Sequence, residues 1–206
     1  GEVLLIELGV SWKEIVKGLN YDLNNINACL VSHTHLDHSK SIPDAIKSGI
    51  SVYSCEEVQS VHKEVKVLKK GLKTPIGGFK VQRVDLFHNC ECIGFLITTP
   101  DKQKILFCTD TNCIPYKFKN VNHWFIESNY SFDLILDKMC DNDYSASASE
   151  NHMEINSTIE FLKENYSADC MTIMLLHLSR NNADEKLFKK QVQEELGFKN
   201  VFVAKK

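Results

Sequence analysis

His33-Thr34-His35-Leu36-Asp37-His38 decides the fold, because this stretch places three imidazoles and one carboxylate within six positions. It directly follows the apolar run Ala28-Cys29-Leu30-Val31-Ser32. Alternation along an extended chain sends the first two histidines to one side, and a turn after them brings Asp37 and the last histidine around a second point. Neutral imidazole and carboxylate groups are ligands that divalent metals accept. The loop therefore predicts two metal sites.

The alternative is a polar loop whose histidines only cap or hydrogen-bond locally. A single histidine usually has such a role, because liganding histidines are a minority of all histidines. A cluster of His and Asp residues at ligand spacing is a far more specific metal signal. We therefore expect metal binding.

The motif resembles the His-x-His-x-Asp-His signature of the metallo-β-lactamase superfamily. The resemblance implies three later ligands, each after an apolar strand. By similarity, His88 would complete the first metal site, His177 would complete the second, and Asp110 would bridge both. Taken singly, each could be an ordinary strand-end or turn residue. The implied ligand set is His33, His35, Asp37, His38, His88, Asp110 and His177. The implied cofactors are two divalent metal ions, with zinc expected and manganese or iron as alternatives.

Length and composition predict one domain over residues 1–206, because 206 residues with 43% hydrophobic content can bury one substantial core. The resemblance implies an α/β fold, a four-layer αββα sandwich with the metals at one edge of two sheets. Superfamily members usually have a strand or two before the one that residues 3–8 resemble, so we expect the first N-terminal strand or strands to be missing. Glu7 stands where that strand usually ends in an acidic residue.

Helices and strands alternate along the chain. Ser11-Trp12-Lys13-Glu14 predicts a capping box that opens a helix ending near Leu19. Further helices are expected over residues 42–48, 56–69, 156–165 and 184–196. Strands are expected over residues 51–53, 79–87, 94–98, 104–108, 123–127, 171–176 and 200–203.

Three further segments resemble the phosphodiesterase branch of the superfamily. Phe125-Ile126-Glu127-Ser128-Asn129-Tyr130 resembles its Glu-containing strand, Ser149-Glu150-Asn151-His152-Met153 its extra histidine motif, and His177-Leu178-Ser179 its final His-x-Ser. The branch includes tRNA 3′-processing endonucleases, DNA exonucleases and phage enzymes that degrade cyclic nucleotides. The resemblance covers nearly the whole chain and is closest to short phage and bacterial members without an inserted domain.

The resemblance implies hydrolysis of nucleic-acid or cyclic-nucleotide phosphodiesters by a metal-bound hydroxide. Asp37, Glu127 and His152 are the expected catalytic residues. His152 would protonate the leaving alkoxide, and Glu127 would hydrogen-bond to its far nitrogen. As alternatives, His152 is an exposed loop histidine and Glu127 an ordinary strand-end carboxylate.

Ser179, Arg180 and Asn181 are the expected substrate-binding residues, because arginine and short polar side chains bind phosphate oxygens well. Arg180 could equally be a solvated charge. With 24 basic and 27 acidic residues, the chain lacks the basic excess that drives binding to long polyanions. This charge balance favours a small cyclic or short nucleotide as the substrate. Short members of this branch are commonly dimers, so we expect a homodimer.

The eight cysteines favour a reducing compartment, since the chain is not small and shows no secretory signal. We expect a cytoplasmic protein with reduced, mostly buried thiols. Cys90-Glu91-Cys92 lies beside His88, but no CxxC pair accompanies it, so we expect these thiols to be packing residues. The apolar stretch over residues 3–6 is too short to span a membrane, and no membrane partner is expected.

Two other functions remain open, because the metal set alone does not choose a reaction. A thioester or lactone hydrolase would use the same metals, would not need His152 and would need an apolar acyl pocket. A catalytically silent module would retain metals and bind a nucleotide without turning it over.

Overall fold

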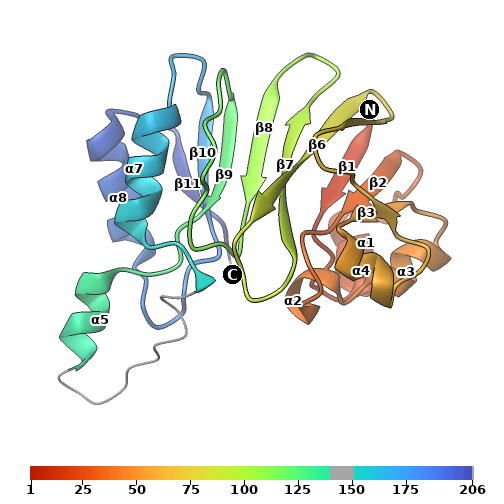
Figure 1. The fold of residues 1–206 in the computed structure, drawn as a ribbon, viewed down its shortest axis with the longest axis horizontal. Helices are drawn as coiled ribbons and strands as arrows, with labels where there is room; N and C mark the ends of the chain where they lie inside the picture. Colours follow the sequence, from red (N-terminus) through yellow and green to blue (C-terminus); the bar gives the residue numbers. More distant parts are fainter. Residues whose placement is uncertain (140–150, 206) are drawn as a thin grey trace. The chain divides into compact units, whose positions relative to one another are not determined.

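The computed structural model describes residues 1–139 and 151–205 of the chain, which Figure 1 shows as a ribbon. They group into two compact units, the first Gly1–Asp85 with Cys90–Ile93 and the second Leu86–Asn89 with Gly94–Lys206. The chain has two sheets combined with helices, so the predicted α/β class is confirmed. The expected single domain stays a prediction.

The first unit contains a parallel four-stranded sheet in the order β1-β2-β3-β4. Its strands are β1 (Val3–Ile6), β2 (Ile26–Leu30), β3 (Val52–Ser54) and β4 (Lys66–Val67). Two further strands, β5 (Lys73–Ile76) and β6 (Phe79–Leu86), form an antiparallel hairpin. The last three residues of central strand β2, Ala28, Cys29 and Leu30, are apolar and fully buried, as expected for an inner strand of a parallel sheet.

Four short helices accompany this sheet: α1 (Trp12–Gly18), α2 (Leu36–Ser39), α3 (Ile42–Lys47) and α4 (Glu56–Val61). The predicted capping box is confirmed at α1. The Ser11 side chain accepts the backbone N–H of Glu14, and the Glu14 carboxylate accepts the backbone N–H of Ser11. Helix α3 packs against β3, and α4 packs against β4.

The helix predicted over residues 56–69 is wrong in its second half. Helix α4 ends at Val61, His62 is extended, and the chain then forms β4, parallel to β3. Val65 and Leu68 on either side of β4 are each only 1% exposed. Pairing with β3 and burial of these two side chains override the local helical pattern.

The second unit contains strands in the order β11-β10-β9-β8-β7. They are β7 (Cys92–Thr98, which starts in residues of the first unit), β8 (Lys104–Cys108), β9 (His123–Glu127), β10 (Thr172–Leu176) and β11 (Val201–Val203). Strand β7 is antiparallel to β8, whereas β8 to β11 run parallel to one another. The carboxyl ends of β8, β9 and β10 therefore meet at one edge.

The helices of this unit are α5 (Phe132–Met139), α7 (Ile155–Asn165) and α8 (Glu185–Leu196). Helices α7 and α8 pack against each other, and α8 packs on β11 (Figure 1). Trp124, Phe95 and Phe188 are fully buried in this unit. Each large apolar side chain removed from water contributes roughly 1.5–3 kcal/mol before the entropic cost of folding. Strand β5 and helix α5 have no counterpart among the predicted elements.

Candidate metal centre

The histidine loop, residues 33–38, begins just beyond the carboxyl end of β2. His35 precedes α2, and its carbonyl oxygen accepts the backbone N–H of His38 at 2.9 Å. The Ser39 hydroxyl donates to the same carbonyl, also at 2.9 Å. The expected turn after His35 is therefore a single helical turn that brings His38 back toward the start of the loop.

The three imidazoles of the histidine loop gather at one point of the first unit. The ring centroid of His33 lies 4.5 Å from that of His35 and 4.4 Å from that of His38. His33 is fully buried, and its Nδ1 lies 2.8 Å from the hydroxyl of Ser32, which orients the ring. Asp37 is exposed, with Oδ2 3.7 Å from Nε2 of His38. Such a cluster of nitrogen and oxygen donors fits a divalent cation.

The residues just after β1 contact the histidine loop and hold its backbone in place. The backbone N–H of Leu8 donates to the carbonyl of His38 at 2.8 Å. Gly9 packs so closely on the loop that a Cβ at this position would overlap the backbone carbonyl of Asp37. Glu7 has a left-handed backbone (φ 69°), and its Oε1 lies 3.5 Å from Nδ1 of His38. The loop is therefore held by backbone contacts that need glycine at position 9.

In the second unit, Asp110, Glu127 and His177 come from the carboxyl ends of three neighbouring parallel strands. Their ligand atoms and that of His152 all lie within 4.8 Å of one another. Asp110 and His177 have left-handed backbones, with φ of 52° and 53°. This conformation costs a non-glycine residue roughly 1–3 kcal/mol and persists mainly at functional sites. The strain supports the interpretation of these strand ends as a site.

Glu127 connects two histidines. Its Oε1 lies 2.7 Å from Nδ1 of His152 and 3.0 Å from Nδ1 of His177, and its Oε2 accepts the backbone N–H of Thr111 at 2.7 Å. A carboxylate only accepts hydrogen bonds, so the imidazoles of His152 and His177 each carry a proton at Nδ1. Nε2 of each ring then faces away from Glu127. Asn129 Nδ2 donates to the His177 carbonyl at 2.7 Å and lies 3.3 Å from Nδ1 of His177. Glu127 Oε1 is closer to that nitrogen, at 3.0 Å, and sets the tautomer.

His88 is oriented by the backbone. Its Nδ1 lies 3.2 Å from the carbonyl oxygen of Asn151, so this nitrogen donates and Nε2 is left facing Asp110. The distance from Nε2 to Oδ1 of Asp110 is 4.0 Å. Metal bonds to imidazole nitrogen and carboxylate oxygen are each about 2.0–2.2 Å long, so one cation can contact both atoms. A carbonyl partner on the far nitrogen is the usual support of a liganding histidine.

The structure assembles the expected residues within each unit. They are His33, His35, Asp37 and His38 in the first unit, and His88, Asp110, Glu127, His152 and His177 in the second. The expected contact between Glu127 and His152 is present. Their catalytic roles stay predictions, as does the complete ligand set. Ser149 and Glu150 of the histidine motif, and Cys140, lie outside the described residues.

The expected substrate-binding residues lie in the turn after β10. The Ser179 hydroxyl accepts the backbone N–H groups of Asn181 at 3.3 Å and Asn182 at 3.2 Å, so it shapes this turn. Arg180 and Asn181 are exposed. Their role in binding substrate stays a prediction.

Sequence reasoning did not identify Gly9, Thr111 or Asn129 as supporting residues. Thr111 and Asn129 act through backbone and amide groups on Glu127 and His177, which only the folded chain brings together. A glycine two residues after the acidic strand end was a usable signal for Gly9.

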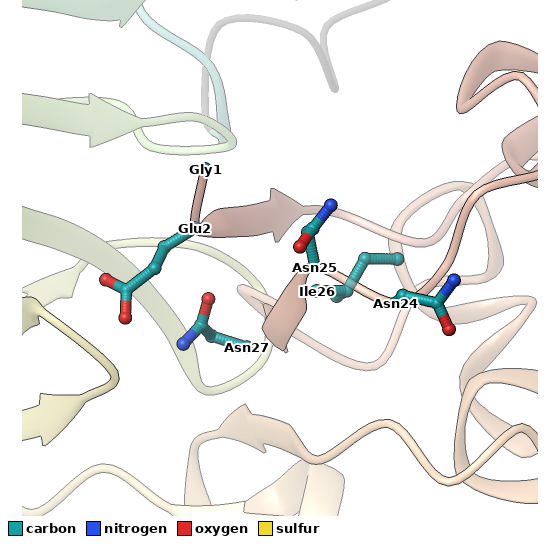
Figure 2. A pocket seen from close by; sticks show the side chains of 6 residues that line it. All are labelled: Gly1, Glu2, Asn24, Asn25, Ile26 and Asn27. Atoms are coloured by element: carbon teal, nitrogen blue, oxygen red, sulfur yellow. The ribbon is translucent and has the colours of Figure 1, made fainter.

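A pocket of about 320 Å³ lies at the opposite ends of β1 and β2, where these strands begin. Figure 2 shows its lining, which is Gly1, Glu2, Asn24, Asn25, Ile26 and Asn27. Because β1 and β2 are parallel, both strands run from this pocket toward the end that carries Glu7 and the histidine loop. The pocket is therefore separate from the histidine cluster.

Comparison with known proteins identifies the class. Residues 13–173 match the model of the beta-lactamase superfamily domain. This chain therefore belongs to the beta-lactamase superfamily. The family consists mostly of metal-dependent hydrolases that hold dinuclear metals, which supports a metal-dependent hydrolase here. No curated protein matches the chain by sequence.

Solved structures share the two-sheet metallo-β-lactamase sandwich. The metallo-beta-lactamase fold protein YhfI from Bacillus subtilis is 19% identical, with a TM-score of 0.74 over 99% of this chain and 85% of that chain. A diphosphatase of the PhnP family is 16% identical (TM-score 0.66; 99% and 77%). The short form of human tRNase Z is 14% identical (TM-score 0.59; 99% and 86%). At these identities the likeness shows the fold.

Among the described residues, no helix combines the length and apolar character needed to cross a bilayer. Within the same part of the chain, no disulfide joins any of the cysteines.

Proposed function

We propose that this protein is a metal-dependent phosphodiesterase that hydrolyses phosphodiester bonds of nucleotides or nucleic acids. One observation carries the proposal: Oε1 of the fully buried Glu127 lies 2.7 Å from Nδ1 of His152. The pairing leaves Nε2 of His152 as the atom that can exchange a proton with substrate. Proton delivery to a poor alkoxide leaving group is what phosphodiester cleavage needs.

The proposed metal ligands are His33, His35, Asp37, His38, His88, Asp110 and His177. When bound, two divalent cations polarise phosphoryl oxygens and stabilise the charge that develops on them. Zinc is the proposed metal, because imidazole-rich sites suit it well. The buried Asp110, with an oxygen 4.0 Å from Nε2 of His88, is the proposed shared ligand.

The chain's own residues account for proton transfer and orientation. Glu127 accepts from Nδ1 of both His152 and His177, so neither ring can turn without losing a hydrogen bond inside the protein. His152 is about one-fifth exposed, which allows a substrate oxygen to reach its Nε2. His152 is thus the proposed acid, and Glu127 positions it.

The proposed substrate is small. A net charge of −3 gives no overall attraction for a long polyanion, whereas the exposed Arg180 after β10 can pair with a single phosphate. A cyclic mononucleotide or short oligonucleotide fits these features best. The similarity to a diphosphatase and to tRNase Z supports phosphate-ester chemistry in the same fold.

The cellular compartment and the oligomeric state are also part of the proposal. Seven thiols without a disulfide among the described residues suit a reducing cytoplasm. A homodimer is proposed as the working form, which sedimentation equilibrium tests directly.

The test measures metal content of the purified protein and its turnover of bis(p-nitrophenyl) phosphate, cyclic nucleotides, single-stranded DNA and RNA. His152→Ala should reduce phosphodiester turnover about 100-fold or more. His123→Ala is the matched control, because His123 lies at the opposite end of β9 from Glu127 and contacts Gln103. This control should retain full turnover.

Three outcomes would contradict the proposal. A metal-free protein would remove the proposed site. Thioester or lactone turnover that survives His152→Ala, with no phosphodiester turnover, would establish the other hydrolase. Tight nucleotide binding without product from any substrate of the panel would establish a silent binding module.

A further inference from the structure

Cys90 lies against the imidazoles of the first unit. The ligand atoms of His33, His35 and Cys90 all lie within 4.8 Å of one another, and Sγ of Cys90 is 3.9 Å from Nε2 of His35. Cys90 is half-buried, in contrast to the fully buried thiols that fill the core. Its position therefore differs from that of a packing residue.

The segment that carries Cys90 is fixed by its neighbour Glu91. The Glu91 carboxylate accepts the backbone N–H of Glu57 at 2.8 Å, and the Glu57 carboxylate accepts the backbone N–H of Glu91 at 2.8 Å. Arg83 adds an ion pair to Glu91 at 2.8 Å. These contacts lie within the first unit, so the thiol is held in place by the same unit that positions the histidines.

Cys92 provides the contrast. Its Sγ lies 3.8 Å from Nδ1 of His33, the nitrogen that already faces the Ser32 hydroxyl at 2.8 Å. Cys92 is also only 2% exposed. Of these two cysteines, only Cys90 is exposed enough to meet an incoming ion.

The distance suits shared coordination. Zinc bonds are about 2.3 Å to thiolate sulfur and 2.0–2.1 Å to imidazole nitrogen, which puts two ligands of one ion about 3.5–4 Å apart for bond angles of about 105–130°. The 3.9 Å between Cys90 and His35 falls in this range. We propose that Cys90 supplies a thiolate ligand to the metal ion that His33 and His35 hold, beyond the seven proposed ligands. This inference rests on the proposed function only in requiring a metal at these two histidines.

A thiolate ligand changes which metal the site selects. Soft sulfur ligands favour zinc, whereas all-nitrogen and oxygen sites also accept manganese. The chain is therefore expected to prefer zinc over manganese, and Cys90→Ser should weaken that preference at least about 10-fold in competition, as loss of a ligand contact does.

The test replaces the native metal of the full chain with Co²⁺ and records the absorption spectrum. Wild type should show a thiolate-to-cobalt charge-transfer band in the near ultraviolet together with the visible bands of bound cobalt. Cys90→Ser should lose the charge-transfer band while still binding cobalt. Cys113→Ser, which changes an exposed thiol, and Cys92→Ser should both keep it.

A second readout does not depend on the variants. Alkylation of the native protein by iodoacetamide, mapped by peptide mass spectrometry, should modify Cys90 in the metal-free protein and spare it when Zn²⁺ is bound. Bound cobalt without a charge-transfer band, or a band that persists in Cys90→Ser, would overturn thiolate ligation while leaving the phosphodiesterase proposal intact. Failure of the chain to bind cobalt at all would overturn both.

Discussion

Glu127 and His152 form a hydrogen-bonded pair, with Oε1 of the buried Glu127 2.7 Å from Nδ1 of the partly exposed His152. Glu127 ends strand β9, whereas His152 precedes helix α7, so only the fold brings them together. The pairing decides which nitrogen of His152 faces outward. It therefore gives the sharpest test of how the site works.

Glu127→Gln is expected to lower phosphodiester turnover about 10–100-fold, the usual effect of losing a partner that orients a functional histidine. The glutamine amide must point its NH₂ either at the Thr111 N–H or at the two histidines, so a donor faces a donor. Steady-state kinetics measure the loss. Glu164→Gln, at an exposed carboxylate, is the control. Wild-type turnover in Glu127→Gln would refute the positioning role.

Gly9→Ala is expected to destabilise the protein by at least about 1–3 kcal/mol, because the added methyl overlaps the Asp37 backbone. Metal uptake should fall with it, since the histidine loop must move. Urea unfolding and metal titration measure both effects. Gly18→Ala is the control, because a Cβ there meets open space at the end of α1 and should be neutral or stabilising. Equal stability of the two variants would contradict the close packing.

The ion pairs around Arg83 predict how the free energy of unfolding depends on pH. Burial alone would lower the pKa of Arg83, but hydrogen bonds to Glu56, Asp85 and Glu91 raise it above its usual value. Burial would raise the pKa of Asp85, yet Lys70 and Arg83 hold it below its ordinary value. A carboxyl group whose pKa is lowered by folding stabilises the fold above its unfolded pKa of about 4. This stabilisation is lost as pH falls through the folded pKa.

The free energy of unfolding of wild type should therefore decrease as pH falls from about 5 toward 2. In Arg83→Met the carboxylates of Glu56, Asp85 and Glu91 repel one another, and protonation relieves this repulsion. The decrease in the free energy of unfolding at low pH should therefore shrink or reverse. Urea unfolding at a series of pH values checks this. Parallel pH profiles for the two proteins would show that Arg83 does not control these carboxyl groups.

Arg180→Ala is expected to raise KM for a phosphodiester several-fold and to leave kcat nearly unchanged, because an exposed arginine that pairs with a phosphate stabilises the bound substrate and the transition state alike. Arg180→Lys should restore only part of the affinity, since lysine cannot bind phosphate in a bidentate way. A loss confined to kcat would exclude a binding role. Lys186→Ala, on helix α8, is the control for a general charge effect.

Much of this site could be predicted from the sequence, because its residues sit at strand ends with strong local signals. The apolar runs before Asp110 and His177 set the strands, and parallel pairing of β8, β9 and β10 then gathers their ends without further information. The capping box at Ser11 was predictable for the same reason, since its hydrogen bonds are local.

What the sequence could not predict depends on distant contacts. The early end of α4 follows from pairing of β4 with β3, not from the residues of the helix itself. The position of Cys90 beside His35 depends on Glu91 and Glu57, which are 34 positions apart. Spacing alone placed Cys90 among packing residues, because no second thiol pair marked it as a ligand.

Gly9 has a consequence for any saturation mutagenesis of this protein. Substitutions at position 9 should be rejected as strictly as substitutions of the histidines that the loop presents, although glycine has no functional group to contribute. A screen scored by activity alone would class it with the reactive residues. Only a parallel measurement of folded abundance would reveal that its intolerance comes from steric exclusion.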